Sequence, residues 1–240
     1  MNFLLQTSHS NLKAEIAVTG SKSETNRLLL LQALFPNISL ANTSNSDDSE
    51  VMQKALKGNE EIVDIHHAGT AMRFLTAYFA VNEGREVVLT GSQRMTERPI
   101  KVLVEALEQL GAKISYEKEV GYPPIRIKGQ KITASKVNIP ANVSSQYISA
   151  LLLVAPKLEN GIEITLVGEI TSVPYIKMTL ALLNDLDVKT SFEGNVISVY
   201  PKQEVASKIM TVESDWSSAS YFFSLVALAK SASISLTSYK

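Results

Sequence analysis

The sequence contains no cysteine, only three histidines and no excess of charge of either sign. Without cysteine the chain has no disulfides, no thiol nucleophile and no thiolate ligands for a metal. The histidines, His9, His66 and His67, are too few and too scattered to indicate a metal site. The net charge of −1 gives no reason to expect a nucleic acid as partner.

Long hydrophobic runs are missing as well. No apolar stretch reaches the roughly 20 residues that a membrane-spanning helix needs, and the first residues lack the basic leader of a signal peptide. The 240 residues are 45% hydrophobic and 20% charged, which is an ordinary globular composition. We therefore expect a soluble cytoplasmic protein of one large or two modest domains, with neither membrane nor nucleic acid as partner.

What the sequence does contain is an alternation of helix and strand signals that repeats. Residues 100–117 (IKVLVEALEQLGAKISYE) align without gaps on residues 176–193 (IKMTLALLNDLDVKTSFE), 76 positions later. Upstream, capped apolar helices are predicted at 68–80 and 144–156, at nearly the same spacing. Each unit reads as strand, helix, strand, helix and two strands over about 70 residues, a period typical of repeated supersecondary units. The predicted class is α/β, with three complete βαβαββ units and the start of a fourth.

The fourth unit consists of an apolar helix over 217–229 and a strand from residue 232 to the last residue. Natural domains seldom end inside a core element. The pattern therefore suggests a piece of a longer protein.

The motif GSKSETNR starts a leucine-rich helix predicted over 21–35. Ser21 and Glu24 have the spacing of a capping box. Lys22 stands at the helix end that disfavours cations, where free N–H groups favour an anion. Two interpretations stay open: an anion socket that includes Ser23 and Arg27, or solvent-facing cations behind a plain serine cap.

Four further turns place polar groups near the start of a predicted helix. Their candidate residues are Gly69 in HHAGTAMR, Arg94 and Arg98 in LTGSQRMTERPI, Ser144, Ser145 and Gln146 in NVSSQYISALLL, and Ser172 and Tyr175 in TSVPYIKM. Each turn has an ordinary explanation: a tight glycine turn, solvated arginines in a loop, serine caps, and a tyrosine packed in the core. Because the turns occupy equivalent places in repeated units, we expect a small polyanionic ligand where several helix N-termini converge.

These motifs resemble those of one known family, the EPSP synthases (3-phosphoshikimate 1-carboxyvinyltransferases). The matches run in the order GSKSETNR, SDD, AGTAMR, LTGSQRMTERPI, GYPP, SSQYISALLL, SVPYIK and VESDWSSASYF. The resemblance implies two similar domains, each of three βαβαββ units, in a monomeric enzyme of the shikimate pathway of aromatic amino acid biosynthesis. It also implies transfer of the enolpyruvyl group of phosphoenolpyruvate to the 5-hydroxyl of shikimate-3-phosphate, through a tetrahedral intermediate that eliminates phosphate, without metal or organic cofactor.

The resemblance also implies roles for single residues. Phosphoenolpyruvate would face Lys22, Gly69 and Arg94, and Lys22 is the candidate for proton transfer. Gln146 would contact both substrates. Shikimate-3-phosphate would be bound by residues from three helix starts, namely Ser23, Arg27, Ser144, Ser145, Ser172 and Tyr175.

The chain departs from the family pattern in places. His67 stands where the family has asparagine, and Phe74 stands where it commonly has proline. The family's remaining acid, lysine and arginine groups come from a second domain, later in the sequence. The resemblance implies that residues 1–20 and 215–240 are edges of that domain and that residues 21–214 form a complete one. We therefore expect this chain alone to be inactive and to carry mainly the shikimate-3-phosphate half of a cleft.

Two alternatives stay open. UDP-N-acetylglucosamine enolpyruvyl transferases share the fold, but that family has asparagine after the early lysine and usually uses a cysteine, whereas here Ser23 follows and cysteine is absent. A non-catalytic anion-binding module is the other alternative. The apolar sequence SYFFSLVALA (220–229) would be exposed in the chain alone, so we also expect self-association.

Overall fold

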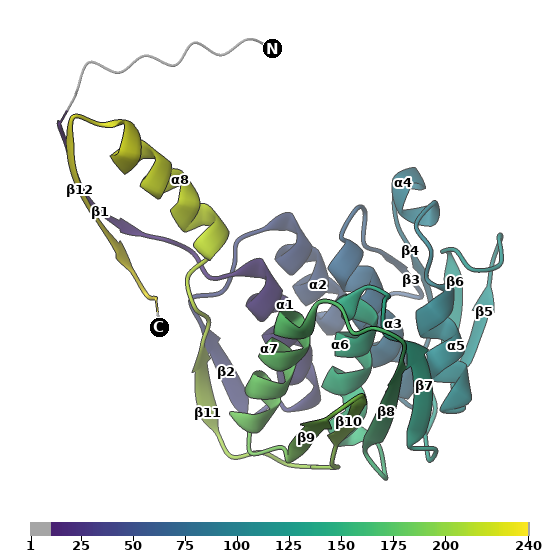
Figure 1. The fold of residues 1–240 in the computed structure, drawn as a ribbon. Coiled ribbons are helices and arrows are strands. Elements are labelled where there is room, and N and C mark those ends of the chain that lie inside the picture. Colours follow the sequence, from purple (N-terminus) through teal and green to yellow (C-terminus); the bar gives the residue numbers. More distant parts are fainter. Residues whose placement is uncertain (1–10, 240) are drawn as a thin grey trace.

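The computed structural model describes residues 11–239, in which helices and short strands alternate along the chain (Figure 1). The strands form two four-stranded and two two-stranded sheets. The predicted α/β class is confirmed. No helix in the described range is long and apolar enough to cross a lipid bilayer.

One complete βαβαββ unit lies in the middle of the chain. Its elements are β3 (Ile62–Asp64), α3 (Gly69–Val81), β4 (Glu86–Thr90), α5 (Lys101–Gln109), β5 (Lys113–Tyr116) and β6 (Ile125–Lys128). The strand order is β3-β4-β6-β5, with β3 parallel to β4 and the other neighbours antiparallel. A short helix, α4 (Gln93–Thr96), lies in the connection that the sequence predicted to be a loop.

The next unit has the same architecture. Its elements are β7 (Lys136–Pro140), α6 (Ser145–Val154), β8 (Ile162–Val167), α7 (Val173–Asn184), β9 (Thr190–Glu193) and β10 (Val196–Val199), with a 3-10 turn at Ala155–Lys157. The order β7-β8-β10-β9, with β7 parallel to β8, reproduces the first sheet strand for strand. The helices α3 and α6 begin 76 residues apart, so the structure confirms the repeat.

A third group of elements is smaller. It contains α1 (Lys22–Leu34), β2 (Ile38–Ala41), α2 (Asp47–Lys57) and, from far along the chain, β11 (Lys208–Thr211). The strands β2 and β11 pair in parallel. Within the described residues this group has two strands instead of four, so the expected count of three complete units is not confirmed.

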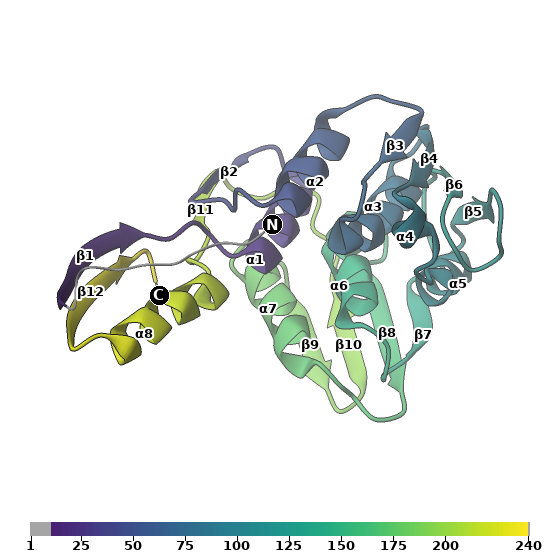
Figure 2. The same ribbon diagram turned by 90° about the horizontal axis from the view of Figure 1, so that it is seen from above.

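The helices of these groups form the centre of the molecule, and the sheets lie outside them (Figure 2). Every residue of α6 except Gln146 is buried, and Leu28–Leu31 of α1 are buried on all sides of that helix. Helices that are apolar all round belong inside a protein. The strands β7 and β8 instead alternate between buried residues and residues that are at least partly exposed, because one sheet face packs on the helices and the other meets solvent.

The strands β1 (Asn11–Ala17) and β12 (Ser231–Thr237) pair in parallel, and α8 (Trp216–Leu228) packs on β12. These three elements extend away from the rest in both views (Figures 1 and 2). The sequence predicts a final strand that runs to residue 240, whereas β12 ends at Thr237. Residue 240 and residues 1–10 of the predicted edge segment lie outside the described range. As expected, α8 exposes large apolar side chains: Trp216, Tyr221, Phe223, Leu225, Val226 and Leu228.

Two chain segments cross from the rest of the molecule into this extension, and they lie side by side as an antiparallel pair at Gly20 and Ser214. The Ser21 N–H donates to the Glu213 carbonyl at 2.8 Å, and the Asp215 N–H donates to the Thr19 carbonyl at 3.0 Å. The buried hydroxyl of Ser214 donates to a third carbonyl, that of Val18, at 2.6 Å. A Cβ at Gly20 would collide with the backbone of Asn42, so the crossing requires glycine there.

Candidate functional site

The start of α1 differs from the predicted capping box. Ser21 occupies the N-cap position, but its side chain makes no capping hydrogen bond. The Glu24 carboxylate accepts a hydrogen bond at 3.0 Å from the N–H of Glu213, and the N–H of Ser21 itself donates to the Glu213 carbonyl at 2.8 Å. The capping-box prediction is therefore wrong. Local spacing suggested it, but the crossing segment supplies donors that a sequence pattern cannot reveal.

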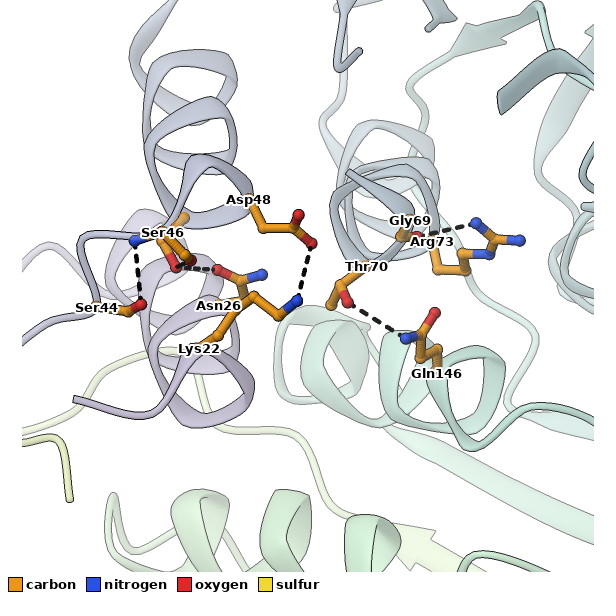
Figure 3. A network of polar contacts seen from close by, with 10 residues as sticks. Lys22, Asn26, Ser44, Ser46, Asp48, Gly69, Thr70, Arg73 and Gln146 are labelled. Carbon is orange, nitrogen blue, oxygen red and sulfur yellow. Dashed lines mark hydrogen bonds and ion pairs between the residues drawn. The ribbon is translucent and has the colours of Figure 1, made fainter. Parts of the chain in front are cut away.

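Lys22 is the first residue of α1, and its side chain is half exposed. Its amine lies 3.8 Å from the carboxylate of Asp48, in the first turn of α2 (Figure 3). One turn further, the Ser49 hydroxyl donates to the amide oxygen of Asn26 at 2.8 Å, while the buried Asn26 Nδ2 has no partner among the described residues. Lys22 thus stands at the anion-attracting end of α1 but beside a carboxylate.

Arg27 lies inside the molecule, with 2% of its surface exposed. Its Nε donates to the Thr179 hydroxyl at 2.8 Å, Nη2 to the Ser149 hydroxyl at 3.1 Å and Nη1 to the Ser23 carbonyl at 2.7 Å. Burial lowers the pKa of Arg27 to about 10, and the nearby Tyr175 phenol opposes this shift. The alternative of a solvent-facing cation is wrong for Arg27, because α6 and α7 cover it.

Two aromatic rings also approach this guanidinium. The Phe74 ring centroid lies 5.5 Å and the Tyr175 centroid 5.9 Å from its central carbon. Phe74 is fully buried, whereas Tyr175 is 46% exposed. The alternative that Tyr175 packs in the core is therefore wrong: it covers Arg27 from the solvent side. Phe74, where the family pattern commonly has proline, contributes a ring face that attracts a cation.

The start of α3 carries Gly69, next to an exposed arginine. A Cβ at Gly69 would lie 2.5 Å from a guanidinium nitrogen of Arg98, which shows how closely that side chain covers the helix end. The neighbouring Thr70 hydroxyl accepts a hydrogen bond from the side chain of Gln146 at 3.2 Å (Figure 3). The starts of α3 and α6 are thereby joined.

Arg73, which the sequence analysis did not identify as a candidate, forms hydrogen bonds that hold the loop carrying Arg98. Arg73 is buried and donates to the Gly69 carbonyl at 3.0 Å and to the Pro99 carbonyl at 3.3 Å. The Tyr147 hydroxyl donates to the same Pro99 carbonyl at 2.7 Å. Burial lowers the pKa of Arg73. Its position four residues after Gly69, on one helix face, was the available signal.

The remaining candidates lie at the starts of α6 and α7. The Ser144 hydroxyl caps α6 by accepting the N–H of Gln146 at 3.3 Å, and Ser145 is buried behind it. Ser172 occupies the N-cap position of α7 with a left-handed backbone (φ +57°) and makes no side-chain cap. The predicted cap is therefore present at α6 and absent at α7.

Hydrogen bonds join the four helices whose first turns carry most of these residues. Arg27 connects α1 with α6 and α7, and the Thr70–Gln146 hydrogen bond connects α6 with α3. Arg94 is exposed on α4, and no hydrogen bond or ion pair in residues 11–239 joins it to any of these helices. In that range, no group of three or more histidine, aspartate or glutamate side chains is placed to hold a metal ion.

Comparison with known proteins decides the family. The family model described as EPSP synthase (3-phosphoshikimate 1-carboxyvinyltransferase) matches residues 39–240. The chain belongs to the EPSP synthase family. A 3-phosphoshikimate 1-carboxyvinyltransferase from Bacteroides fragilis strain YCH46 is 46% identical over 238 residues, which cover 99% of this chain and 58% of that relative. The relative from Actinobacillus pleuropneumoniae serotype 5b is 38% identical and is also covered over 58% of its length.

A solved EPSP synthase structure, from Acinetobacter baumannii, resembles this one with a TM-score of 0.77 over 95% of this chain and 56% of that chain. At 22% sequence identity, this likeness shows the fold alone. The chain thus spans 58% of the length of the curated EPSP synthase relatives named above.

Proposed function

We propose that this chain is the shikimate-3-phosphate-binding part of an enzyme that transfers the enolpyruvyl group of phosphoenolpyruvate to the 5-hydroxyl of that substrate. The observation that carries this proposal is Arg27, a buried guanidinium whose hydrogen bonds all go to neutral groups. A buried cation without a counter-ion is costly to maintain. An anionic ligand beside it would supply the missing charge.

The surroundings of Arg27 suit such a ligand. A guanidinium has five N–H donors, and the three hydrogen bonds of Arg27 leave two for a ligand. Because Arg27 is covered, the ligand reaches these donors when the exposed ring of Tyr175 turns aside. Ser23, Ser144, Ser145 and Ser172 add neutral donors at the helix starts nearby, where free N–H groups favour anions.

The phosphoenolpyruvate side is proposed to consist of Lys22, Gly69 and Arg94, with Gln146 between the two substrates. Lys22 and Arg94 would neutralise carboxylate or phosphate charge as the tetrahedral intermediate forms and phosphate leaves. Lys22 is the proposed proton-transfer group, and it must leave Asp48 to act. Gly69 has no side chain, so a ligand can approach the backbone at the start of α3 once the exposed Arg98 guanidinium beside it moves away.

We further propose that residues 21–214 form one domain and that residues 1–20 and 215–240 belong to a second. The separate β1, β12 and α8 layer supports this division, as does the crossing of the chain at Gly20 and Ser214. Because the relatives are longer, the chain alone is proposed to lack turnover. The cytoplasmic location stays a prediction.

A calorimetric ligand series on this chain tests the function. Shikimate-3-phosphate should bind more tightly than shikimate or inorganic phosphate, because Arg27 and the helix starts recognise ring hydroxyls and phosphate together. Preferential binding of UDP-N-acetylglucosamine would favour the sister transferase. Equal binding of every small anion would favour a plain anion-binding module. A turnover assay with both substrates should show no product, and clear activity would contradict the proposed inactivity.

A further inference from the structure

Arg27 is held by a pair of hydroxyl groups from the two helices of one repeat unit, a unit to which Arg27 itself does not belong. Thr179 of α7 accepts from Nε and Ser149 of α6 accepts from Nη2, and both residues are completely buried. Charged residues are rarely so buried unless they are paired with an opposite charge. No ion pair among residues 11–239 includes Arg27. The acceptors are therefore neutral where carboxylates would be expected.

The two hydroxyls also fix each other. The Thr179 oxygen lies 2.9 Å from the Tyr175 carbonyl and 3.0 Å from the Ser149 oxygen. Each hydroxyl has a single proton. All four contacts are satisfied when Thr179 donates to the Tyr175 carbonyl and Ser149 donates to Thr179. Both oxygens then direct lone pairs at the guanidinium, so neither can rotate away without losing a buried hydrogen bond.

We propose that Thr179 and Ser149 are positioning residues: they fix the orientation of Arg27 through neutral acceptors and so leave its charge and two remaining donors for an anionic ligand at Ser23 and Tyr175. This inference rests on the proposed function, in which Arg27 binds shikimate-3-phosphate. A carboxylate at either position would hold the same guanidinium but would also neutralise it. Hydroxyls hold it without that competition.

The decisive comparison is Thr179→Asp against Thr179→Asn. Both side chains have nearly the volume of threonine and can accept from Nε, but only aspartate carries a counter-charge. We expect the aspartate variant to bind shikimate-3-phosphate at least tenfold more weakly than the asparagine variant, while its melting temperature is no lower. Equal affinity of the two variants would overturn the inference, because a merely structural role does not depend on leaving the charge of Arg27 uncompensated.

The NMR signal of the Arg27 Nε–H tests the hydrogen bond from Arg27 to Thr179 without any ligand. An Nε–H that donates to a buried hydroxyl is protected from exchange, so Arg27 should give a persistent Nε–H resonance in the wild-type chain. Thr179→Val should lose this protection and weaken binding. The matched control is Thr76→Val, because Thr76 is equally buried and its hydroxyl donates only to its own helix, at the Met72 carbonyl. Unchanged protection in Thr179→Val would overturn the inference.

The two proposals fail in different ways. If the wild-type chain does not bind shikimate-3-phosphate, the proposed function fails, and inorganic phosphate becomes the probe for the same Thr179 variants. Phosphate that binds the asparagine variant more tightly than the aspartate variant supports the positioning role. Phosphate that binds both equally, or binds neither them nor the wild type, overturns it.

Discussion

The amine of Lys22 lies 3.8 Å from the carboxylate of Asp48, so the first turns of α1 and α2 face each other with opposite charges. In the proposed site, an anion must compete with Asp48 for Lys22. We expect Asp48→Asn to raise the affinity for inorganic phosphate a few-fold at low salt. The stability of the fold should fall by less than about 1 kcal/mol, since the lysine is half exposed.

Titration with phosphate at two salt concentrations measures this effect. It should largely disappear at 1 M salt, where the screening length is about 3 Å. Asp47→Asn is the matched control, because it removes the same charge from the same helix turn without breaking the ion pair. A gain of equal size in both variants would show that general charge, and not competition for Lys22, sets the affinity.

Gly69→Ala should separate the two substrates. The new methyl group would displace the Arg98 guanidinium at the start of α3, since it would lie 2.5 Å from it. The fold should tolerate this within about 1 kcal/mol, because alanine favours helices and the displaced group is the end of a flexible side chain. We expect phosphoenolpyruvate binding to weaken at least tenfold while shikimate-3-phosphate binding is unchanged.

Gly84→Ala gives the opposite pattern and serves as the control. Gly84 has φ +80° and open space around it, so alanine there strains the backbone but contacts nothing. It should lower stability and leave both affinities as they are. Two-dimensional NMR titrations of each variant would measure these weak affinities. Loss of shikimate-3-phosphate binding in Gly69→Ala would contradict the assignment.

Tyr147→Phe should loosen the loop that carries Arg98. It removes the hydroxyl that donates to the Pro99 carbonyl at 2.7 Å but leaves the Arg73 hydrogen bond to the same oxygen. We expect the free energy of unfolding in urea to fall by about 1 kcal/mol. Tyr200→Phe, at an exposed position, should change it by less than about 0.5 kcal/mol. Equal effects would mean that the hydrogen bond does not stabilise the fold.

The depressed pKa of Arg27, about 10, gives a pH dependence with a definite sign. Below that value Arg27 is charged in both the folded and the unfolded chain. Above it the folded chain loses the proton first, so this group's contribution to stability rises with pH while its attraction for an anion disappears. Shikimate-3-phosphate affinity should therefore stay level from pH 7 to about 9 and fall above pH 10. An affinity that shows no decline at any pH above 10 would contradict the role of Arg27.

The exposed face of α8 predicts self-association of the chain. Phe223 is 52% and Leu228 86% exposed. Replacing both by serine should reduce the average mass in analytical ultracentrifugation with little change in the melting temperature, because more than half of each side chain is exposed. Tyr200→Ser, at an exposed position on the main body, is the control. A wild-type chain that stays monomeric at high concentration would contradict the prediction.

The sequence predicted the units and the starts of most helices because these depend on local patterns. Apolar periodicity and the repeat placed α3, α6 and α7, and the motif order pointed to the family. It failed where the outcome depends on distant residues. Glu24 was expected to cap its own helix, but a segment 189 residues away donates to it. For Arg27 the residue spacing alone leaves an anion-binding group and a solvent-facing cation equally open, because the helices that bury it begin more than 100 residues later.

Residues with no polar signature of their own were missed altogether. Thr179 and Ser149 lie in apolar helices, where nothing in the sequence distinguishes them from other hydroxyl residues. Only the fold shows that they accept hydrogen bonds from Arg27. Arg73 stands in a motif that was noticed only for its glycine. In each case the function of the side chain is set by what the tertiary packing brings to it, which a single sequence does not encode locally.

The proposed function depends above all on the binding of the anionic substrate by Arg27. The most direct test is calorimetry of shikimate-3-phosphate with the wild-type chain, Arg27→Met, Arg27→Lys and the control Arg126→Met. A charge-assisted hydrogen bond contributes about 1.5–3 kcal/mol, which is roughly 10- to 150-fold in affinity. We expect a loss of that size in Arg27→Met, a partial recovery in Arg27→Lys, and no change in Arg126→Met. A folded Arg27→Met chain that binds as tightly as the wild type would contradict this role of Arg27.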